Sequence, residues 1–222
     1  MGVQVEIWSD VVCPWCYIGK RRFEAALAGF DHRDDVAVTW RSFELDPDAP
    51  RRREGSSADS LARKYGITAD AAAANQDRIT RLGAEEGLEY RFDLAAGGNT
   101  FDAHRLIHLA AAHGLQDADK ERLMAAYFSE GAAIGDPSTL LGLAVEVGLD
   151  EADARGVLDS DAFAEAVRSD EQEAVHLGIS GVPFFVLDRR YGISGAQPAE
   201  MIGQALRHAW IEGRNEEPMA QG

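Results

Sequence analysis

The N-terminal part of the chain alternates between strand-like and helix-like spacing of its apolar residues. Residues 3–7 carry apolar side chains at every second position, which is the period of a short strand. Apolar residues then return every three or four positions from Trp15 to about Ala28, where Gly29 ends a predicted helix. Residues 36–43 are rich in Val, Thr, Trp and Phe and predict a second strand. The chain therefore begins with a predicted β-α-β unit.

The middle of the chain, residues 58–177, follows the helical period almost throughout. It is rich in alanine, has Pro137 as its sole proline and is punctuated by glycines. Seven helices are predicted there, over residues 60–65, 69–86, 101–113, 118–129, 137–147, 151–158 and 162–177.

The strand period returns in the last fifth of the chain. Residues 182–187 form a dense apolar run, a polar hairpin tip follows, and residues 191–194 predict a short partner strand. A last helix is expected from Pro198, because proline suits the first helical turn. In order, the elements are β-α-β, a helical block and β-β-α, which predicts a mixed α/β protein.

Composition indicates a folded, acidic protein. Of 222 residues, 45% are apolar and 27% are charged, and 22 Lys and Arg stand against 38 Asp and Glu, a formal net charge of −16. This charge, with no long basic run, argues against nucleic acid as a partner. No apolar run approaches the ~18 residues of a membrane span, and the N-terminus has no secretory pattern. We therefore expect a cytoplasmic protein that does not bind membranes; its oligomeric state stays open.

The chemistry-bearing motif is Cys13-Pro14-Trp15-Cys16, between the first predicted strand and helix. Free N–H groups and the positive end of the helix dipole favour a thiolate at Cys13, which can attack disulfides. One helical turn brings Cys16 within reach to close an intramolecular disulfide. Pro14 suits the first turn because its missing N–H would have no partner there. We interpret the pair as a redox dithiol.

The cysteine pair also has two other interpretations, half of a zinc site or two core residues. Half of a zinc site has the same spacing, but four Cys and His ligands cannot be assembled around a single pair. The pair could also be two core residues, since free cysteine packs as a small apolar side chain. His104 and His108 lie four apart, as in some metal sites, but with no third ligand they are expected to be ordinary helix histidines. No metal site is predicted.

Gly181-Val182-Pro183-Phe184 opens the third predicted strand. Proline cannot donate a hydrogen bond within a sheet, so Pro183 is either an ordinary strand-initiating residue or part of a special turn with a cis peptide bond.

Several motifs together resemble the DsbA family of thioredoxin-fold oxidoreductases, and most closely its cytosolic FrnE-like branch, which is related to hydroxychromene-carboxylate isomerases and kappa-class glutathione transferases. The matching segments are residues 9–19 around the cysteines, 43–45, 99–106 and 180–184. The resemblance implies an α/β thioredoxin fold with a large all-helical insertion. It divides the chain into a thioredoxin-fold domain (1–47 and 178–214), an inserted helical domain (48–177) and a frayed tail (215–222).

The same resemblance implies the roles of the site residues. Cys13 becomes the exposed nucleophile, Cys16 the resolving thiol and Pro183 a cis-proline that faces them. Val182 would offer its backbone to an extended substrate strand. Trp15 stands where periplasmic family members carry histidine, which leaves the redox poise open.

Three further residues are candidates for a substrate groove. Glu44 could accept a proton from Cys16, although a solvated charge at the end of a strand is favoured. Asn99 and His104 resemble positions that line the groove in the related branch. Apolar residues of the helical block could form a docking face or a core, of which the core is favoured: Phe101, Leu106, Met124, Tyr127 and Phe128.

We therefore predict a thiol–disulfide oxidoreductase, a reductase or isomerase that acts through a mixed disulfide. It needs no bound cofactor, because an external thiol or dithiol resets the cysteine pair. Protein or peptide disulfides and dithiols are the expected substrates, with small thiols as further partners. Two alternatives stay open: a glutathione- or thiol-dependent isomerase or transferase acting on a small aromatic compound, and a redox-gated chaperone or binding module.

Overall fold

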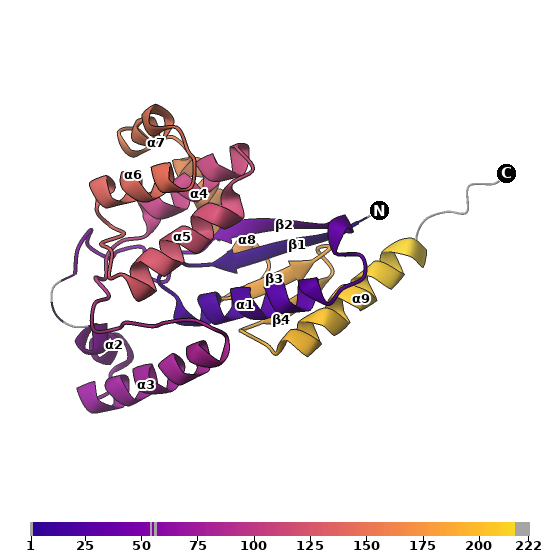
Figure 1. The fold of residues 1–222 in the computed structure, drawn as a ribbon, viewed down its shortest axis with the longest axis horizontal. Coiled ribbons are helices and arrows are strands. Elements are labelled where there is room, and N and C mark those ends of the chain that lie inside the picture. The colour runs from indigo at the N-terminus through magenta and orange to yellow at the C-terminus, as the bar shows by residue number, and fades with distance from the viewer. Residues whose placement is uncertain (1, 54, 56, 216–222) are drawn as a thin grey trace.

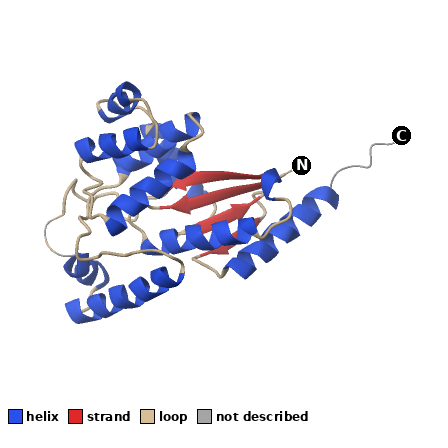
Figure 2. Cartoon of the chain, viewed as in Figure 1, coloured by secondary structure: helices blue, strands red, loops and turns tan. Residues whose placement is uncertain are grey.

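The computed structural model describes residues 2–53, 55 and 57–215. Four strands form one sheet, β1 (Val3–Ser9), β2 (Val36–Ser42), β3 (Phe184–Leu187) and β4 (Tyr191–Ser194) (Figures 1 and 2). Helix α1 (Pro14–Ala28) and then a short 3-10 helix (Arg33–Asp35) connect β1 to β2. Helix α9 (Ala199–Asn215) follows β4. Between β2 and β3 lie α2 (Ser57–Tyr65), α3 (Ala69–Glu85), α4 (Phe101–Ala112), α5 (Gln116–Ser129), α6 (Pro137–Glu146), α7 (Glu151–Leu158) and α8 (Ala164–His176).

The sheet has the order β2-β1-β3-β4. Strand β1 pairs in parallel with β2 and antiparallel with β3, and β3 and β4 form an antiparallel hairpin. A parallel neighbour requires a crossover connection, which α1 supplies. The carboxyl end of central strand β1 therefore leads directly to the cysteine motif at the start of α1.

The alternation along β1 divides its side chains between two helical layers. Val3, Val5 and Ile7 belong to the core that contains α1 and α9, two helices that pack against each other over one face of the sheet (Figure 1). Trp8 points to the opposite face, where it packs with Ala174 of α8. Since both faces are covered, the sheet is buried on both sides.

The structure confirms the predicted α/β fold, including all seven helices of the middle block. Strand β3 begins at Phe184, two residues later than predicted, because Pro183 has no N–H to enter the ladder. Asn215 ends α9, and the rest of the predicted tail, 216–222, lies outside the described residues. No helix within the described ranges is long and apolar enough to cross a membrane.

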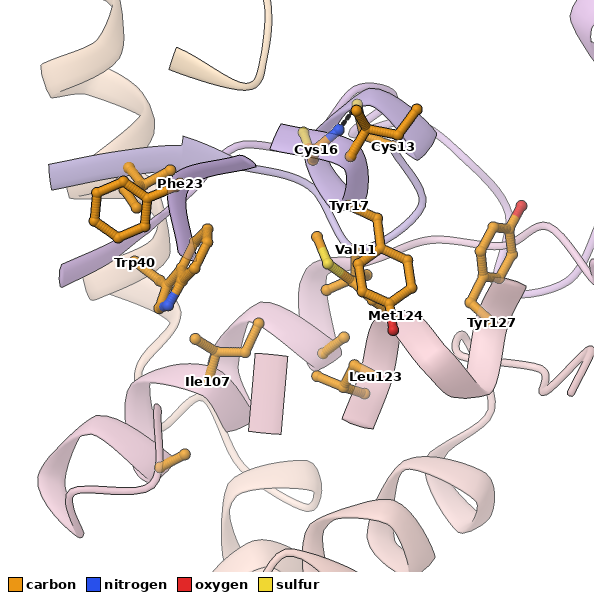
Figure 3. Close-up of a cluster of buried hydrophobic side chains, with 14 of the residues drawn as sticks. Val11, Cys13, Cys16, Tyr17, Phe23, Trp40, Ile107, Leu123, Met124 and Tyr127 are labelled. Carbon is orange, nitrogen blue, oxygen red and sulfur yellow. Dashed lines mark hydrogen bonds between the residues drawn. The ribbon is translucent and has the colours of Figure 1, made fainter. Parts of the chain in front are cut away.

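The predicted division into two domains stays a prediction. One cluster of buried apolar residues runs from β1 and α1 into α4, α5 and α6. This cluster includes Val11 and Cys16, near the end of β1 and the start of α1, and Leu123 and Met124 of α5 (Figure 3). The helical block thus shares its core with the sheet.

Candidate dithiol site

Cys13 is the N-cap residue of α1, and Pro14 occupies the first helical position as expected. The Cys16 N–H donates to Cys13 Sγ at 3.2 Å, the contact drawn as a dashed line in Figure 3. A backbone N–H aimed at sulfur, together with the positive end of the helix dipole, stabilises negative charge on that sulfur. The local structure therefore favours Cys13 as the nucleophile of the pair.

Cys16 lies one turn into the helix and is 1% exposed. Burial raises the pKa of its thiol well above the ordinary value, and the neighbouring Cys13 raises it further. Cys16 is therefore protonated at neutral pH, while Cys13 Sγ receives the stabilising N–H. This asymmetry matches the predicted division into an attacking and a resolving thiol.

Cys13 is less accessible than the resemblance implied, because it is only 3% exposed. Its thiol donates to the Val182 carbonyl at 3.6 Å, so the loop before β3 covers one side of the sulfur. The other side borders a cavity. The expectation of an exposed nucleophile is thus wrong for this conformation, and access to the sulfur runs through the cavity.

The Val182–Pro183 peptide bond is cis, which confirms the special turn suggested by the sequence. Gly19, one helical turn beyond Cys16, lets this loop approach α1: a Cβ atom on Gly19 would lie 2.8 Å from Pro183 Cγ. The glycine therefore allows Pro183 to pack on the cysteine-bearing helix.

A buried hydrogen-bonded pair, Asp10 and His104, lies beneath the motif. Asp10 accepts the Leu45 N–H at 2.8 Å and contacts His104 Nε2 at 3.3 Å. Burial raises the pKa of Asp10, but the hydrogen bond from His104 and the Leu45 N–H outweigh it and hold the pKa below its usual range. Burial lowers the pKa of His104. His104 therefore holds the loop that carries Asp10 in place. Although it is a predicted groove residue, His104 does not line the cavity that borders Cys13.

Lys120 of α5 and Tyr90 support the motif from the helical block. Lys120 is 1% exposed and donates to the Ser9 carbonyl at 3.2 Å, and burial lowers the pKa of its ammonium to about 8. The Tyr90 hydroxyl donates to the Pro14 carbonyl at 2.6 Å. Sequence analysis identified neither residue: Lys120 lies in a charged stretch that resembles an exposed helix face, and Tyr90 lies in a loop.

A cavity of about 490 Å³ opens beside Cys13. Pro14, Trp15 and Val182, three of the predicted residues of the site, line it together with Cys13, whereas Cys16 and Pro183 lie outside the lining. Its further walls come from α2, α3 and the aromatic side chains Phe92, Tyr127 and Phe128. The structure therefore places the Cys13 sulfur beside a space large enough for part of a small molecule or peptide.

Glu44 does not lie at this cavity, and the favoured expectation of a solvated charge is wrong. Its side chain is fully buried and paired with Arg168 of α8. Burial raises the pKa of Glu44 to about 7 even though Arg168 opposes the shift. Helix α8 covers this end of β2, a packing arrangement that no local pattern predicts.

Asn99 also lies outside the cavity lining. Its side-chain carbonyl accepts the Phe101 N–H at 2.9 Å at the start of α4, and its amide donates to the Pro47 carbonyl at 3.1 Å. His108 lies 3.1 Å from Asp170 and is not paired with His104. Within the described ranges, no three His, Cys, Asp or Glu residues are placed to hold a metal ion.

The favoured core interpretation of the helical block is confirmed for four of its five residues. The buried ones are Leu106, Met124, Tyr127 and Phe128. Phe101 is half-buried, under the Arg168 guanidinium.

This arrangement, a cysteine pair at the start of a helix opposite a cis-proline, is typical of a thioredoxin-fold protein. The family of the DSBA-like thioredoxin domain matches residues 4–207, so the chain belongs to that family. The probable DsbA oxidoreductase SCO1869 from Streptomyces coelicolor is 47% identical, with a TM-score of 0.91 over 99% of this chain and 94% of that one. YwbO from Bacillus subtilis (strain 168) is 29% identical over 93% of this chain and 96% of its own length. A 2-hydroxychromene-2-carboxylate isomerase shares the fold, with 17% identity and a TM-score of 0.73 over 97% of this chain and all of its own.

Proposed function

We propose that the protein is a thiol–disulfide oxidoreductase that reduces or isomerises disulfides through Cys13 and Cys16. The Cys13 thiolate attacks one sulfur of a substrate disulfide, forms a mixed disulfide and releases the other sulfur as a thiolate. Cys16 then loses its proton and attacks Cys13 Sγ. The substrate leaves as a second thiolate, reduced by two electrons, and the protein holds a Cys13–Cys16 disulfide.

The placement of the two sulfurs carries this proposal. Cys13 Sγ combines the N-cap position, an N–H donor at 3.2 Å and a border on the cavity. Cys16 is buried behind it, so a bulky substrate cannot reach it first. The Val182 carbonyl accepts from the Cys13 thiol. Once Cys13 has formed the mixed disulfide and lost its proton, this carbonyl is free to accept a backbone N–H from an extended substrate strand.

An external thiol or dithiol completes the proposed cycle by reducing the Cys13–Cys16 disulfide. We expect the cytoplasm as the compartment, because its thiol pools keep such pairs reduced and favour reduction or isomerisation of substrates. No bound cofactor takes part in the cycle.

The test is catalysed reduction of insulin by dithiothreitol, together with reactivation of scrambled ribonuclease. We expect the wild type to precipitate reduced insulin faster than dithiothreitol alone and Cys13→Ser to return the rate to background. Cys16→Ser should accumulate a mixed disulfide that is visible by mass spectrometry, because nothing resolves it. Equal rates for the wild type and Cys13→Ser would refute the proposal.

A glutathione-dependent isomerase or transferase is the second candidate. The cavity favours it, because its aromatic lining has room for a small aromatic compound. Calorimetric titration with reduced glutathione, followed by turnover of an aromatic substrate by Cys16→Ser, distinguishes the two. Activity that survives loss of Cys16 would favour the second candidate.

A further inference from the structure

The cavity beside Cys13 carries positive charge in a strongly acidic protein. Three basic residues line it, Arg53, Lys64 and Arg78, whereas the whole chain has a formal net charge of −16. The two carboxylates of the lining are already engaged: Asp46 pairs with Arg53, and Asp10 lies between the Leu45 N–H and His104. Asp46 therefore neutralises Arg53 locally. Two cations remain against the Asp10 carboxylate, so the three cations and two carboxylates leave the lining with a formal charge of +1.

Those two cations are Lys64 of α2 and Arg78 of α3. Lys64 donates to the Leu45 carbonyl at 3.1 Å, and Arg78 donates to the Asn75 side-chain carbonyl at 3.1 Å. Among the described residues, neither has a carboxylate within ion-pair distance. Both side chains are exposed, so a ligand in the cavity can reach them.

Arg78 is held directly against the cysteine motif. Its guanidinium carbon lies 5.4 Å from the centre of the Trp15 ring, the geometry of a cation–π contact. Trp15 lies between the two cysteines, so this contact fixes a positive charge near the reactive sulfur. Trp15 therefore serves as a platform for Arg78.

We propose that Lys64 and Arg78 select peptide disulfides whose cysteine is flanked by carboxylates. This inference rests on the proposed oxidoreductase function. The remote negative surface would repel such a peptide, but the Debye length of ~8 Å at physiological salt confines strong effects to nearby charges. Tyr65 and Ile67, both exposed and both in the cavity lining, add an apolar rim for neighbouring side chains of a peptide.

The test uses symmetrical disulfides of short peptides in which the single cysteine is flanked by Glu, Gln or Lys. Each kcat/KM is divided by the uncatalysed rate of the same peptide with dithiothreitol, which removes differences in thiol reactivity. We expect the wild type to prefer the Glu peptide over the Lys peptide by about fivefold to tenfold, since exposed ion pairs contribute modestly. Raising the salt concentration should reduce this preference.

Charge reversal at the two sites gives the decisive comparison. The double variant Lys64→Glu/Arg78→Glu should invert the preference. The matched control Arg63→Glu/Arg81→Glu changes the net charge equally, on the same two helices, at exposed residues outside the cavity lining, and should keep it. Trp15→Leu should weaken the preference, because Arg78 loses its platform.

The outcomes separate the selectivity from the function. If the Gln peptide is reduced no faster by the wild type than by Cys13→Ser, the oxidoreductase function itself fails. If the Gln peptide is turned over but the two double variants show the same preference as the wild type, the selectivity proposal is overturned. Glutathione disulfide also carries carboxylates on both sides of its cysteines, so a higher kcat/KM for it than for the Glu peptide would overturn the assignment to longer peptide chains in favour of a small thiol.

Discussion

Gly19 decides how closely the cis-proline loop can approach the cysteines. Its hydrogen faces Pro183, and a methyl group there would lie 2.8 Å from Pro183 Cγ and 3.5 Å from Phe185 Cζ. We expect Gly19→Ala to destabilise the protein by about 1–3 kcal/mol, the usual cost of overpacking a core, and to slow insulin reduction as the Val182 carbonyl moves away from Cys13. Urea unfolding and the insulin assay measure the two effects.

Gly142 in α6 provides the control for that substitution. No atom lies within 4 Å of where its Cβ would be, so alanine there should stabilise the helix by about 0.5–1 kcal/mol. A Gly19→Ala variant as stable as Gly142→Ala would show that α1 and the Pro183 loop do not touch as described.

Asp119 makes stability depend on pH in the direction opposite to most carboxylates. Both carboxylate oxygens are buried without a hydrogen-bond partner among the described residues, and burial raises the pKa of Asp119 to about 7, although Lys120 opposes the shift. The folded state therefore binds the proton more tightly than the unfolded state, and this contribution to stability is lost as the pH rises from about 4 through 7.

Asp119→Asn should remove the loss of stability that accompanies ionisation of Asp119, because the amide never ionises. The difference in unfolding free energy between the variant and the wild type should be small near pH 4 and favour the variant at pH 8, by about 1.4 kcal/mol for each unit of pKa shift at most. Urea titrations at both pH values measure it. A difference in unfolding free energy that does not change with pH would show that burial does not raise the pKa of Asp119.

At the scale of elements, Asp170 makes three of the hydrogen bonds by which α8 attaches to the sheet. The Asp170 side chain accepts from Arg41 and from the Ser42 N–H, both at 2.9 Å, and its carbonyl accepts from the Trp8 indole at 2.9 Å. Burial raises the pKa of Asp170, but the hydrogen bonds from His108 and the Ser42 N–H and the charge of Arg41 outweigh it. The pKa is held below its usual range, so the carboxylate is ionised at neutral pH. Helix α8 is therefore both the last helix of the block and the helix that covers one face of the sheet.

This attachment also shows what sequence patterns can and cannot predict. Hydrophobic periodicity gave the order of the strands and helices, and the spacing of Cys13 and Cys16 gave the centre of the site, because both signals are local. The burial of Glu44 and Lys120 depends on contacts across most of the chain, with α8 and with the end of β1. A charged residue in a polar stretch carries no local sign of such a partner.

At the scale of the whole molecule, the apolar core joins the sheet to the helical block without a break. The cluster that contains Ile7 of β1 and Cys16 of α1 also contains Leu140 of α6. Two of the tryptophans, Trp8 and Trp40, are buried in the sheet, whereas most helices of the chain belong to the block. Tryptophan fluorescence thus reports on the sheet and on its contacts with the block, since Trp8 donates to the Asp170 carbonyl of α8 and Trp40 donates to the Asp117 carboxylate of α5. Far-ultraviolet circular dichroism reports mainly on the helices.

We expect the protein to unfold as one cooperative unit because of that shared core. Leu140 is fully buried, so Leu140→Ala should cost about 2–5 kcal/mol and lower the urea midpoints of fluorescence and circular dichroism together. Val145→Ala, in the same helix but 43% exposed, should leave both midpoints nearly unchanged. A Leu140→Ala variant whose circular dichroism midpoint falls while its fluorescence midpoint stays would contradict a single cooperative unit, because two-state unfolding requires both probes to report the same transition.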